Sequence, residues 1–313
     1  MTSDSSTAAD AERLNEEAKA RETAGALAEA IALYEAATRA APTWDAPWFN
    51  LGLLYKRRRH WAESLRCNRK ATELAPAAGE PAWWNLGIAA TALGDWPTAR
   101  AAWKGYGVDL PEGHGPIEGD LGLVSIRICP EDHPETLWCR RIDPARAVLL
   151  NVPLPETGRR WRDLILHDGA PNGYRLLDGA EVPVFDELEL LAPSPFGTYV
   201  AKLVSARPEP VAALIATLDR LPDVTAEDWT SSIELLCRAC SEGRPHDHHD
   251  HAPPAATPWK PERLVGIAAR KPGPAQEAIA DWCRAGHGGL TSFECQLPPH
   301  SEPPALGDDP YDR

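Results

Sequence analysis

Trp48-Phe49-Asn50-Leu51-Gly52 recurs as Trp83-Trp84-Asn85-Leu86-Gly87, 35 residues further along the chain. Each stretch begins a segment of helical length, and a second such segment follows it and ends near a proline, Pro76 or Pro111. A period of this length indicates stacked helical hairpins, which bury a core between neighbours and leave a concave face open to other chains. The first third of the sequence therefore predicts an all-helical array.

The repeated positions resemble those of the tetratricopeptide repeat (TPR) family over residues 11–113. Two repeats, 45–78 and 80–113, carry most of the family's large, small and closing proline positions: Trp48, Leu51, Gly52, Tyr55, Ser64, Asn68, Ala71 and Pro76, then Trp83, Leu86, Gly87, Ala90, Ala99, Trp103 and Pro111. A weaker repeat, 11–44, lacks the Trp and the Leu-Gly pair and is expected to be a polar cap. The resemblance implies that paired helices approach closely at Gly52 and Gly87.

Composition limits the classes of protein. The chain has 313 residues, enough for about two domains, and a formal net charge of −14. Nucleic acid is not expected as the main partner, because phosphate binding needs accumulated positive charge. No apolar run reaches the ~18 residues of a membrane span, and residues 1–7 are too polar for a secretion signal. We therefore expect a cytoplasmic protein with no membrane partner. The 25 arginines against 7 lysines suggest a bacterial source.

Changes in composition divide the chain into segments. Residues 1–10 are expected to be disordered, 114–119 to form a Gly- and Pro-rich linker, and 120–297 to form an α+β domain. Within that domain, residues 241–261 form a His- and Pro-rich loop. The tail, 298–313, is rich in Pro and Asp and is expected to be disordered. The fold class is thus a helical array followed by an α+β domain.

Short alternating apolar runs mark the strands of the second domain, which is predicted to be a small half-open barrel with βα additions. A helix is expected over residues 226–240, and the acidic pairs Asp186-Glu187 and Glu227-Asp228 are expected to face solvent. Three stretches loosely resemble a bacterial domain family of unknown function, which implies no activity: Leu137-Trp138, Asn151-Val152-Pro153 and Asp186-Glu187-Leu188.

A cysteine pair and a histidine run suggest a metal site. Cys237 and Cys240 lie at i and i+3, and His246 and His248 follow closely. Two thiolates and two imidazoles are ligands for a tetrahedral Zn²⁺ ion, which would stabilise the fold directly. Two alternatives stay open: the cysteines are small apolar side chains on a buried helix face, or they form a redox pair.

The concave face of the array is the expected partner-binding site. In the repeat register, Phe49, Leu53 and Lys56 of the second repeat point into it, as do Trp84 and Ile88 of the third. The corresponding residues of the first repeat are Asn15 and Lys19. Aromatic residues here favour an apolar peptide or helix as partner. The alternative is that Phe49 and Trp84 pack against the C-terminal domain or a further helix.

The basic run Lys56-Arg57-Arg58-Arg59-His60 falls in the expected turn of the second hairpin. It is either a solvated loop or a docking patch for an acidic partner segment. Elsewhere, Cys139, His167 and Asp168 could supply a nucleophile and a base, but no local signature supports this chemistry.

The strong motif is a binding module, so the sequence predicts a protein-interaction adaptor or scaffold that uses a TPR groove, with a second domain that zinc stabilises. The alternative is an enzyme or modifying factor whose second domain acts on substrates that the repeats recruit.

Overall fold

The computed structural model describes residues 2–177, 180–232 and 259–300. The chain divides into two compact units. The first is helical and comprises residues 1–119 with the turn Asp143–Ala145, and the second is rich in strands and comprises the rest. Within the described ranges, no helix is long and apolar enough to cross a membrane.

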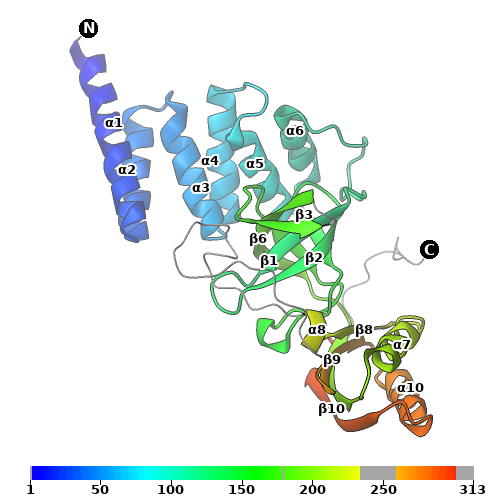
Figure 1. Ribbon diagram of the computed structural model, residues 1–313. Coiled ribbons are helices and arrows are strands. Elements are labelled where there is room, and N and C mark those ends of the chain that lie inside the picture. The colour runs from blue at the N-terminus through cyan, green and yellow to red at the C-terminus, as the bar shows by residue number, and fades with distance from the viewer. Residues whose placement is uncertain (1, 178–179, 233–258, 301–313) are drawn as a thin grey trace. The chain divides into compact units, whose positions relative to one another are not determined.

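Six helices of the first unit form three hairpins that stack in chain order (Figure 1). The hairpins are α1 (Thr2–Thr23) with α2 (Leu27–Ala40), α3 (Asp45–Arg57) with α4 (Trp61–Leu74), and α5 (Pro81–Ala92) with α6 (Trp96–Tyr106). One hairpin corresponds to each of the three predicted repeats. This stack of hairpins is the array that the TPR resemblance implies.

Glycine allows the paired helices to approach closely at two repeated positions. A Cβ atom on Gly52 would lie 2.6 Å from Nδ2 of Asn68, and one on Gly87 would lie 2.5 Å from Cη2 of Trp103. The hydroxyl of Ser64 also donates a hydrogen bond to the carbonyl of Gly52 at 2.9 Å. The close helix contacts expected at Gly52 and Gly87 are therefore present.

Helix α1 begins at Thr2, whereas the sequence predicted disorder up to residue 10. Alanines at positions 8, 9 and 11 favour a helix. Arg13 also lies 3.5 Å from Asp10 and 3.7 Å from Glu17, at helical spacing. The helix therefore extends over residues whose polar composition predicted disorder.

The second unit begins with a barrel. Its strands are β1 (Leu123–Ile128), β2 (Glu135–Arg141), β3 (Arg146–Leu149), β4 (Leu164–His167) and β6 (Ala180–Ala192), with a short 3₁₀ helix η1 (Pro155–Thr157) before β4. Strand β5 (Tyr174–Leu177) pairs with the start of β6 as a hairpin. The strand order is β1-β2-β3-β4-β6-β5, and β1 also pairs with β6.

The barrel is closed, whereas a half-open one was predicted. The closing pair is parallel, with Ser125 opposite Val184 and Arg127 opposite Asp186. Strand β6 makes this possible because it has 13 residues and its register with β4 shifts twice, and such irregularities bend a strand. Alternating side chains from all five strands fill the interior, among them Ile126, Cys139 and Phe185.

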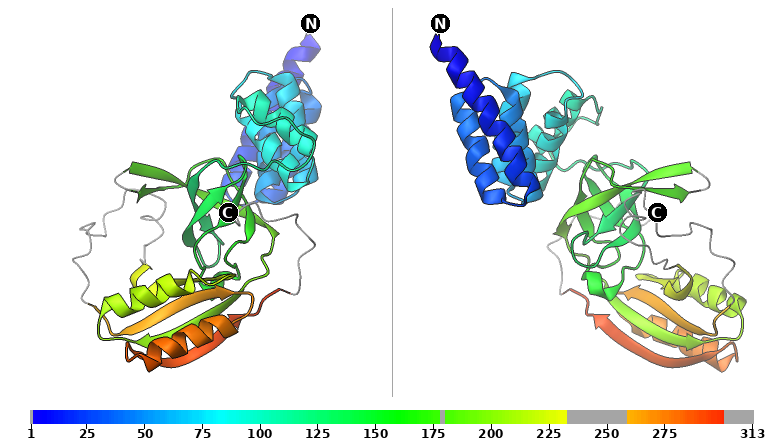
Figure 2. Two further views of the ribbon diagram at one scale, coloured as in Figure 1. Left: turned by 90° about the vertical axis from the view of Figure 1, so that its right-hand side faces the viewer. Right: turned by 60° about the vertical axis from the view of Figure 1, so that its left-hand side comes forward.

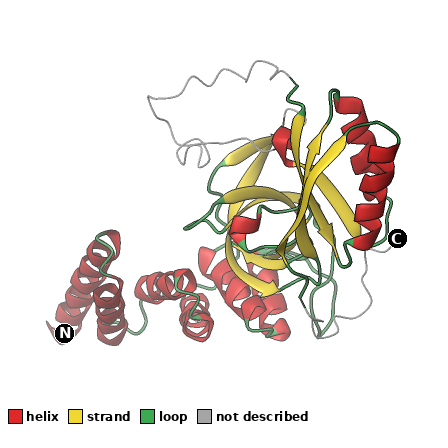
Figure 3. Ribbon diagram, turned by 90° about the horizontal axis from the view of Figure 1, so that it is seen from below, coloured by secondary structure: helices red, strands yellow, loops and turns green. Residues whose placement is uncertain are grey.

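A four-stranded antiparallel sheet completes the second unit. Its elements are β7 (Gly197–Val204), α7 (Pro208–Leu218), β8 (Val224–Asp228), α8 (Trp229–Ser232), β9 (Glu262–Ala269), α10 (Gly273–Arg284) and β10 (Gly289–Leu297). The strand order is β10-β7-β9-β8. Helices α7 and α10 cover one face of this sheet (Figures 2 and 3). The arrangement is the βαββαβ motif of ferredoxin-like folds.

The helix predicted over residues 226–240 is wrong at its start. Ala226, Glu227 and Asp228 belong to β8, and they pair with Ile267, Gly266 and Val265 of β9. Long-range strand pairing therefore overrides the helical pattern of this segment. Helix α8 begins only at Trp229, and residues 233–258 lie outside the described part of the chain.

The face of the sheet opposite α7 and α10 packs on the loop that precedes β4. Trp229 lies in a cluster with Val152, Phe196, Val200 and Ala268. Its indole N–H donates a hydrogen bond to the carbonyl of Val152 at 3.0 Å. The barrel and the sheet of the second unit thus share a small apolar core.

Candidate partner-binding site

Three of the predicted groove residues are partly exposed on the first helices of neighbouring repeats. Phe49 and Leu53 lie one turn apart on α3, and Trp84 lies on α5. Because residues at i and i+4 share a helix face, Phe49 and Leu53 form one apolar stripe along α3. This stripe provides side chains that a partner could contact.

Trp84 is partly used inside its own hairpin. Its ring centroid lies 5.0 Å from that of Trp103 and 4.8 Å from that of Tyr106, and both contacts are edge-to-face. Such aromatic pairs stabilise helix packing. Trp84 thus packs against α6 of its own repeat, which is neither the second domain nor a further helix.

Two predicted groove residues are buried. The exposed fraction is 3% for Lys56 and 0% for Ile88. The repeat register gives the direction of a side chain but not how far its neighbours cover it. Lys56 and Ile88 therefore do not offer their side chains to a partner, and we remove them from the groove.

Of the two first-repeat residues, Asn15 differs from expectation. Asn15 is buried, and its Oδ1 accepts a hydrogen bond from Nδ2 of Asn50 at 3.0 Å. Lys19 lies 2.8 Å from the carboxylate of Glu16 on the same helix. Asn15 therefore links the first two repeats, and Lys19 belongs to an exposed ion pair.

A hollow that the sequence did not predict lies between α4, α5 and α6. It has a volume of about 580 Å³, and Pro76, Trp83, Leu86 and Pro97 supply its apolar walls. Arg69, Thr72, Glu73 and Thr98 are polar members of the lining. Pro76, Trp83 and Pro97 lie near helix ends and could have indicated this hollow from the sequence. The TPR pattern, however, accounts for Pro76 and Trp83 as packing residues.

The proposed zinc ligands Cys237, Cys240, His246 and His248 lie outside the described residues. In the part of the chain that is described, no group of three or more His, Cys, Asp or Glu side chains could hold a metal ion. The zinc site therefore stays a prediction from the sequence.

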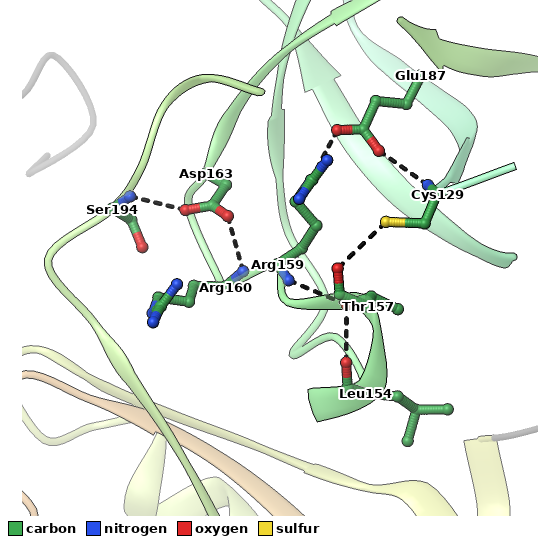
Figure 4. Close-up of polar contacts among 8 residues, drawn as sticks. All are labelled: Cys129, Leu154, Thr157, Arg159, Arg160, Asp163, Glu187 and Ser194. Atoms are coloured by element: carbon green, nitrogen blue, oxygen red, sulfur yellow. Dashed lines mark hydrogen bonds and ion pairs between the residues drawn. The ribbon is translucent and has the colours of Figure 1, made fainter. Parts of the chain in front are cut away.

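A polar cluster in the barrel includes an acidic residue that was expected to face solvent. Glu187 is 3% exposed. One of its carboxylate oxygens lies 2.7 Å from Nε of Arg159, and the other accepts the backbone N–H of Cys129 at 2.8 Å (Figure 4). The thiol of Cys129 donates to the carbonyl of Thr157 at 3.2 Å. Glu187 therefore ties the loop after β1 to the segment before β4.

The remaining expected solvent-facing acids are also engaged. Asp186 lies 2.6 Å from Arg127, and Asp228 pairs with Arg263. Glu227 accepts hydrogen bonds from Asn151 at 3.2 and 3.3 Å. The expectation failed because strand alternation turns Glu187 inward, and the other three carboxylates have partners on neighbouring segments.

A second buried carboxylate holds the chain between the barrel and the sheet. Asp163 accepts the backbone N–H groups of Ser194 at 2.7 Å and Arg160 at 2.8 Å (Figure 4). Burial raises the pKa of Asp163 to about 6, although these hydrogen bonds oppose the shift. Because both oxygens have backbone donors, the residue acts as a structural anchor.

The thiol of the possible nucleophile is not suited to catalysis. Cys139 is fully buried on β2. Burial raises the pKa of its thiol far above the usual value, and the nearby Glu187 carboxylate raises it further. The Nδ1 atom of His167 lies 2.7 Å from the carbonyl of Asp168. A buried thiol with a raised pKa is a poor nucleophile, so Cys139 is a core residue.

No protein-family model matches the chain, and no curated protein matches it. The first third is similar to the TPR domain of Sgt2 from Aspergillus fumigatus, with 24% identity and a TM-score of 0.28 over 31% of this chain and 63% of that one. The first TPR of Spaghetti (RPAP3), bound to the HSP90 peptide SRMEEVD, has 22% sequence identity and a TM-score of 0.30. This match covers 32% of this chain and 78% of that one. YrrB, a TPR protein with an unusual peptide-binding site, has 19% sequence identity and a TM-score of 0.29, and the match covers 30% of this chain and 48% of that one.

The chain thus covers less than two thirds of the Sgt2 structure. The six helices in three hairpins, with their close contacts at Gly52 and Gly87, define the array as one of TPR type.

Proposed function

We propose that the chain is an adaptor that binds a protein segment along the first helices of its repeats. The observation that supports this function most directly is the apolar stripe of Phe49 and Leu53, which stays partly exposed on α3 with Trp84 on the next repeat. Aromatic and aliphatic anchors of this kind contribute most of the binding energy in many peptide grooves. The partner would be an apolar peptide or helix, and binding would take place in the cytoplasm.

Site-specific photo-crosslinking tests this function in cells. A photo-crosslinking phenylalanine analogue is placed at position 49, at position 93 or at position 101, one position in each sample. Leu93 is an exposed apolar residue in the α5–α6 turn and serves as the control, and Ala101 lines the hollow between α4 and α6. A protein captured from position 49 alone supports the proposal. Capture from position 101 alone would move the binding site to the hollow, and equal capture from all three would count against a specific groove.

We further propose that Cys237, Cys240, His246 and His248 bind one Zn²⁺ ion that stabilises the second unit. The support is their spacing: two thiols three residues apart and two imidazoles within the following eight residues. This metal would have a structural role, since two cysteines and two histidines fill a tetrahedral shell and leave no open position.

A further inference from the structure

The turn between α3 and α4 carries a cluster of exposed positive charge. Arg57, Arg58, Arg59 and His60 are all exposed. Arg57 pairs with Glu22 of α1. Among the described residues, neither Arg58 nor Arg59 has an acidic partner. Two uncompensated cations therefore lie side by side on a chain whose formal net charge is −14.

The backbone of Arg59 makes its presence costly. Its φ is 59°, and the corresponding positions in the turns of the other hairpins are Gly25 and Gly94, with φ of 77° and 68°. Glycine adopts this left-handed conformation freely, whereas a side chain with a Cβ is strained. The second hairpin thus has a cation where glycine would be more stable, and such strain is retained mainly where a residue is used.

The apolar stripe of α3 ends at Arg57, next to Arg58 and Arg59 of the turn. Phe49, Leu53 and Arg57 follow one another at intervals of four residues on the same helix. With a rise of 1.5 Å per residue, Arg58 lies about 14 Å along the axis from Phe49. About four residues of an extended chain span this distance. A segment anchored on Phe49 and Leu53 can therefore reach the turn.

A hollow beside the turn adds room for such a segment. It has a volume of about 460 Å³ and lies between the turns of the first two hairpins, lined by Arg58 and by residues 25–29. Glu29 in this lining lies 3.0 Å from Arg21, which compensates its charge. The local charge that remains for a ligand is therefore that of Arg58.

We infer that Arg58 and Arg59 bind acidic residues of the partner segment, placed about four residues beyond its apolar anchor. This inference rests on the proposed function and specifies the chemistry of the partner. An acidic peptide fits better than a nucleic acid. The patch is confined to one turn, and a long phosphate backbone would meet the negative charge of the rest of the chain.

Selection from a peptide display library on the full chain tests the inference. The wild type is compared with an Arg58→Gln, Arg59→Gly double variant. We expect wild-type selections to combine apolar residues with Asp or Glu about four positions away, and we expect the double variant to lose the acidic preference. For one selected peptide, the variant should bind about fivefold more weakly, as should the same peptide with Glu replaced by Gln.

Two control variants distinguish a specific loss of binding from misfolding and from a general loss of positive charge. Arg59→Gly alone should raise the melting temperature while it weakens binding, so misfolding cannot explain the loss. Arg39→Gln removes an exposed cation of α2, 3.9 Å from Glu35, and should leave binding unchanged.

Other outcomes would overturn the inference separately from the proposed function. Suppose that the selected peptides are apolar, show no acidic preference, and need Phe49 but not Arg58 or Arg59 for binding. This result would contradict the role of the two arginines and would still support the adaptor function. Enrichment of no peptide would remove both. Tighter binding of a single-stranded oligonucleotide that depends on Arg58 and Arg59 would replace the acidic peptide by nucleic acid.

Discussion

The indole of Trp103 lies directly against the backbone of Gly87, so that a Cβ atom on this glycine would be 2.5 Å from Cη2 of the ring. Helices α5 and α6 can approach this closely only without a side chain at position 87. The third hairpin therefore requires glycine at position 87.

Gly87→Ala should destabilise the array. Overpacking against Trp103 costs about 3 kcal/mol and better helix propensity returns about 1, so we expect a net loss of about 2 kcal/mol. Thermal or urea unfolding followed by circular dichroism measures it. Gly115→Ala is the matched control, because nothing lies within 4 Å of a Cβ at that position. Equal stability of the two variants would contradict the close contact.

Arg59→Gly should stabilise the second hairpin by about 1 kcal/mol, because it removes the strain of a left-handed backbone. Arg59→Ala removes the same charge but retains Cβ, so it should give no such gain. Chemical denaturation of the two variants separates strain from charge. A gain of the same size in both would show that charge repulsion, and not the backbone, is the cause.

The Glu135 carboxyl should make stability depend on pH. Burial raises its pKa to about 7, the hydrogen bond from the Leu154 N–H opposes the shift, and Glu227 and Glu156 add to it. The folded state therefore holds a proton between about pH 4.5 and 7 that the unfolded state releases. Since the pKa is raised, stability falls as pH rises through this window and levels off above it.

Glu135→Gln removes this titration while its side-chain oxygen can still accept the N–H of Leu154. We expect the variant to be about 2 kcal/mol more stable than wild type at pH 8, with the difference much smaller at pH 5. Urea unfolding at the two pH values measures it. A difference that is the same at both would rule out the carboxyl as its source.

Breaking the Arg159–Glu187 pair should be costly. Arg159→Met leaves a carboxylate that is 3% exposed without its guanidinium partner, and we expect a loss of about 3 kcal/mol. Adding Glu187→Gln should recover part of it, because the uncompensated charge is gone. Denaturant unfolding of the single and double variants tests this, and no recovery in the double variant would point to lost packing of the arginine.

Zinc should be found in tag-free protein at about one ion per chain, measured by elemental analysis. Cys237→Ser with Cys240→Ser should abolish it and lower the melting temperature of the second unit. His249→Ala with His251→Ala is the matched control and should retain the metal. Protein without zinc after purification in its presence would leave the cysteines as apolar or redox residues.

The array could be predicted from the sequence because its contacts are local and periodic. Gly52 and Gly87 mark the same helix crossing in two repeats, and the crossing is where the repeat register places it. The first repeat was harder to define, because α1 has neither the Trp nor the Leu-Gly pair that marks the other two repeats.

The second unit was predicted less well because partners distant in sequence decide it. Ala226 and Glu227 look helical locally, yet they pair with Ile267 and Gly266 about 40 residues later. Barrel closure depends likewise on where the long strand β6 bends. Glu187 follows Phe185 by two residues and so shares its inward face, which was the overlooked signal that this acid is buried.

The candidate site was predicted in part. Phe49, Leu53 and Trp84 are partly exposed on the expected helices, whereas Lys56 and Ile88 are buried. Repeat patterns give the direction of a side chain along a helix. They do not show how tightly the adjacent helices cover it, and they gave no sign of the hollow between α4 and α6.

The parallel pairing of β1 with β6 has a consequence for biosynthesis. It joins residues 59 positions apart, as between Ser125 and Val184, so the barrel cannot close until the ribosome has released the chain beyond β6. The hairpins of the array need only neighbouring segments, which form contacts quickly. The proposed binding surface on α3 and α5 can therefore form while the second unit is still being translated.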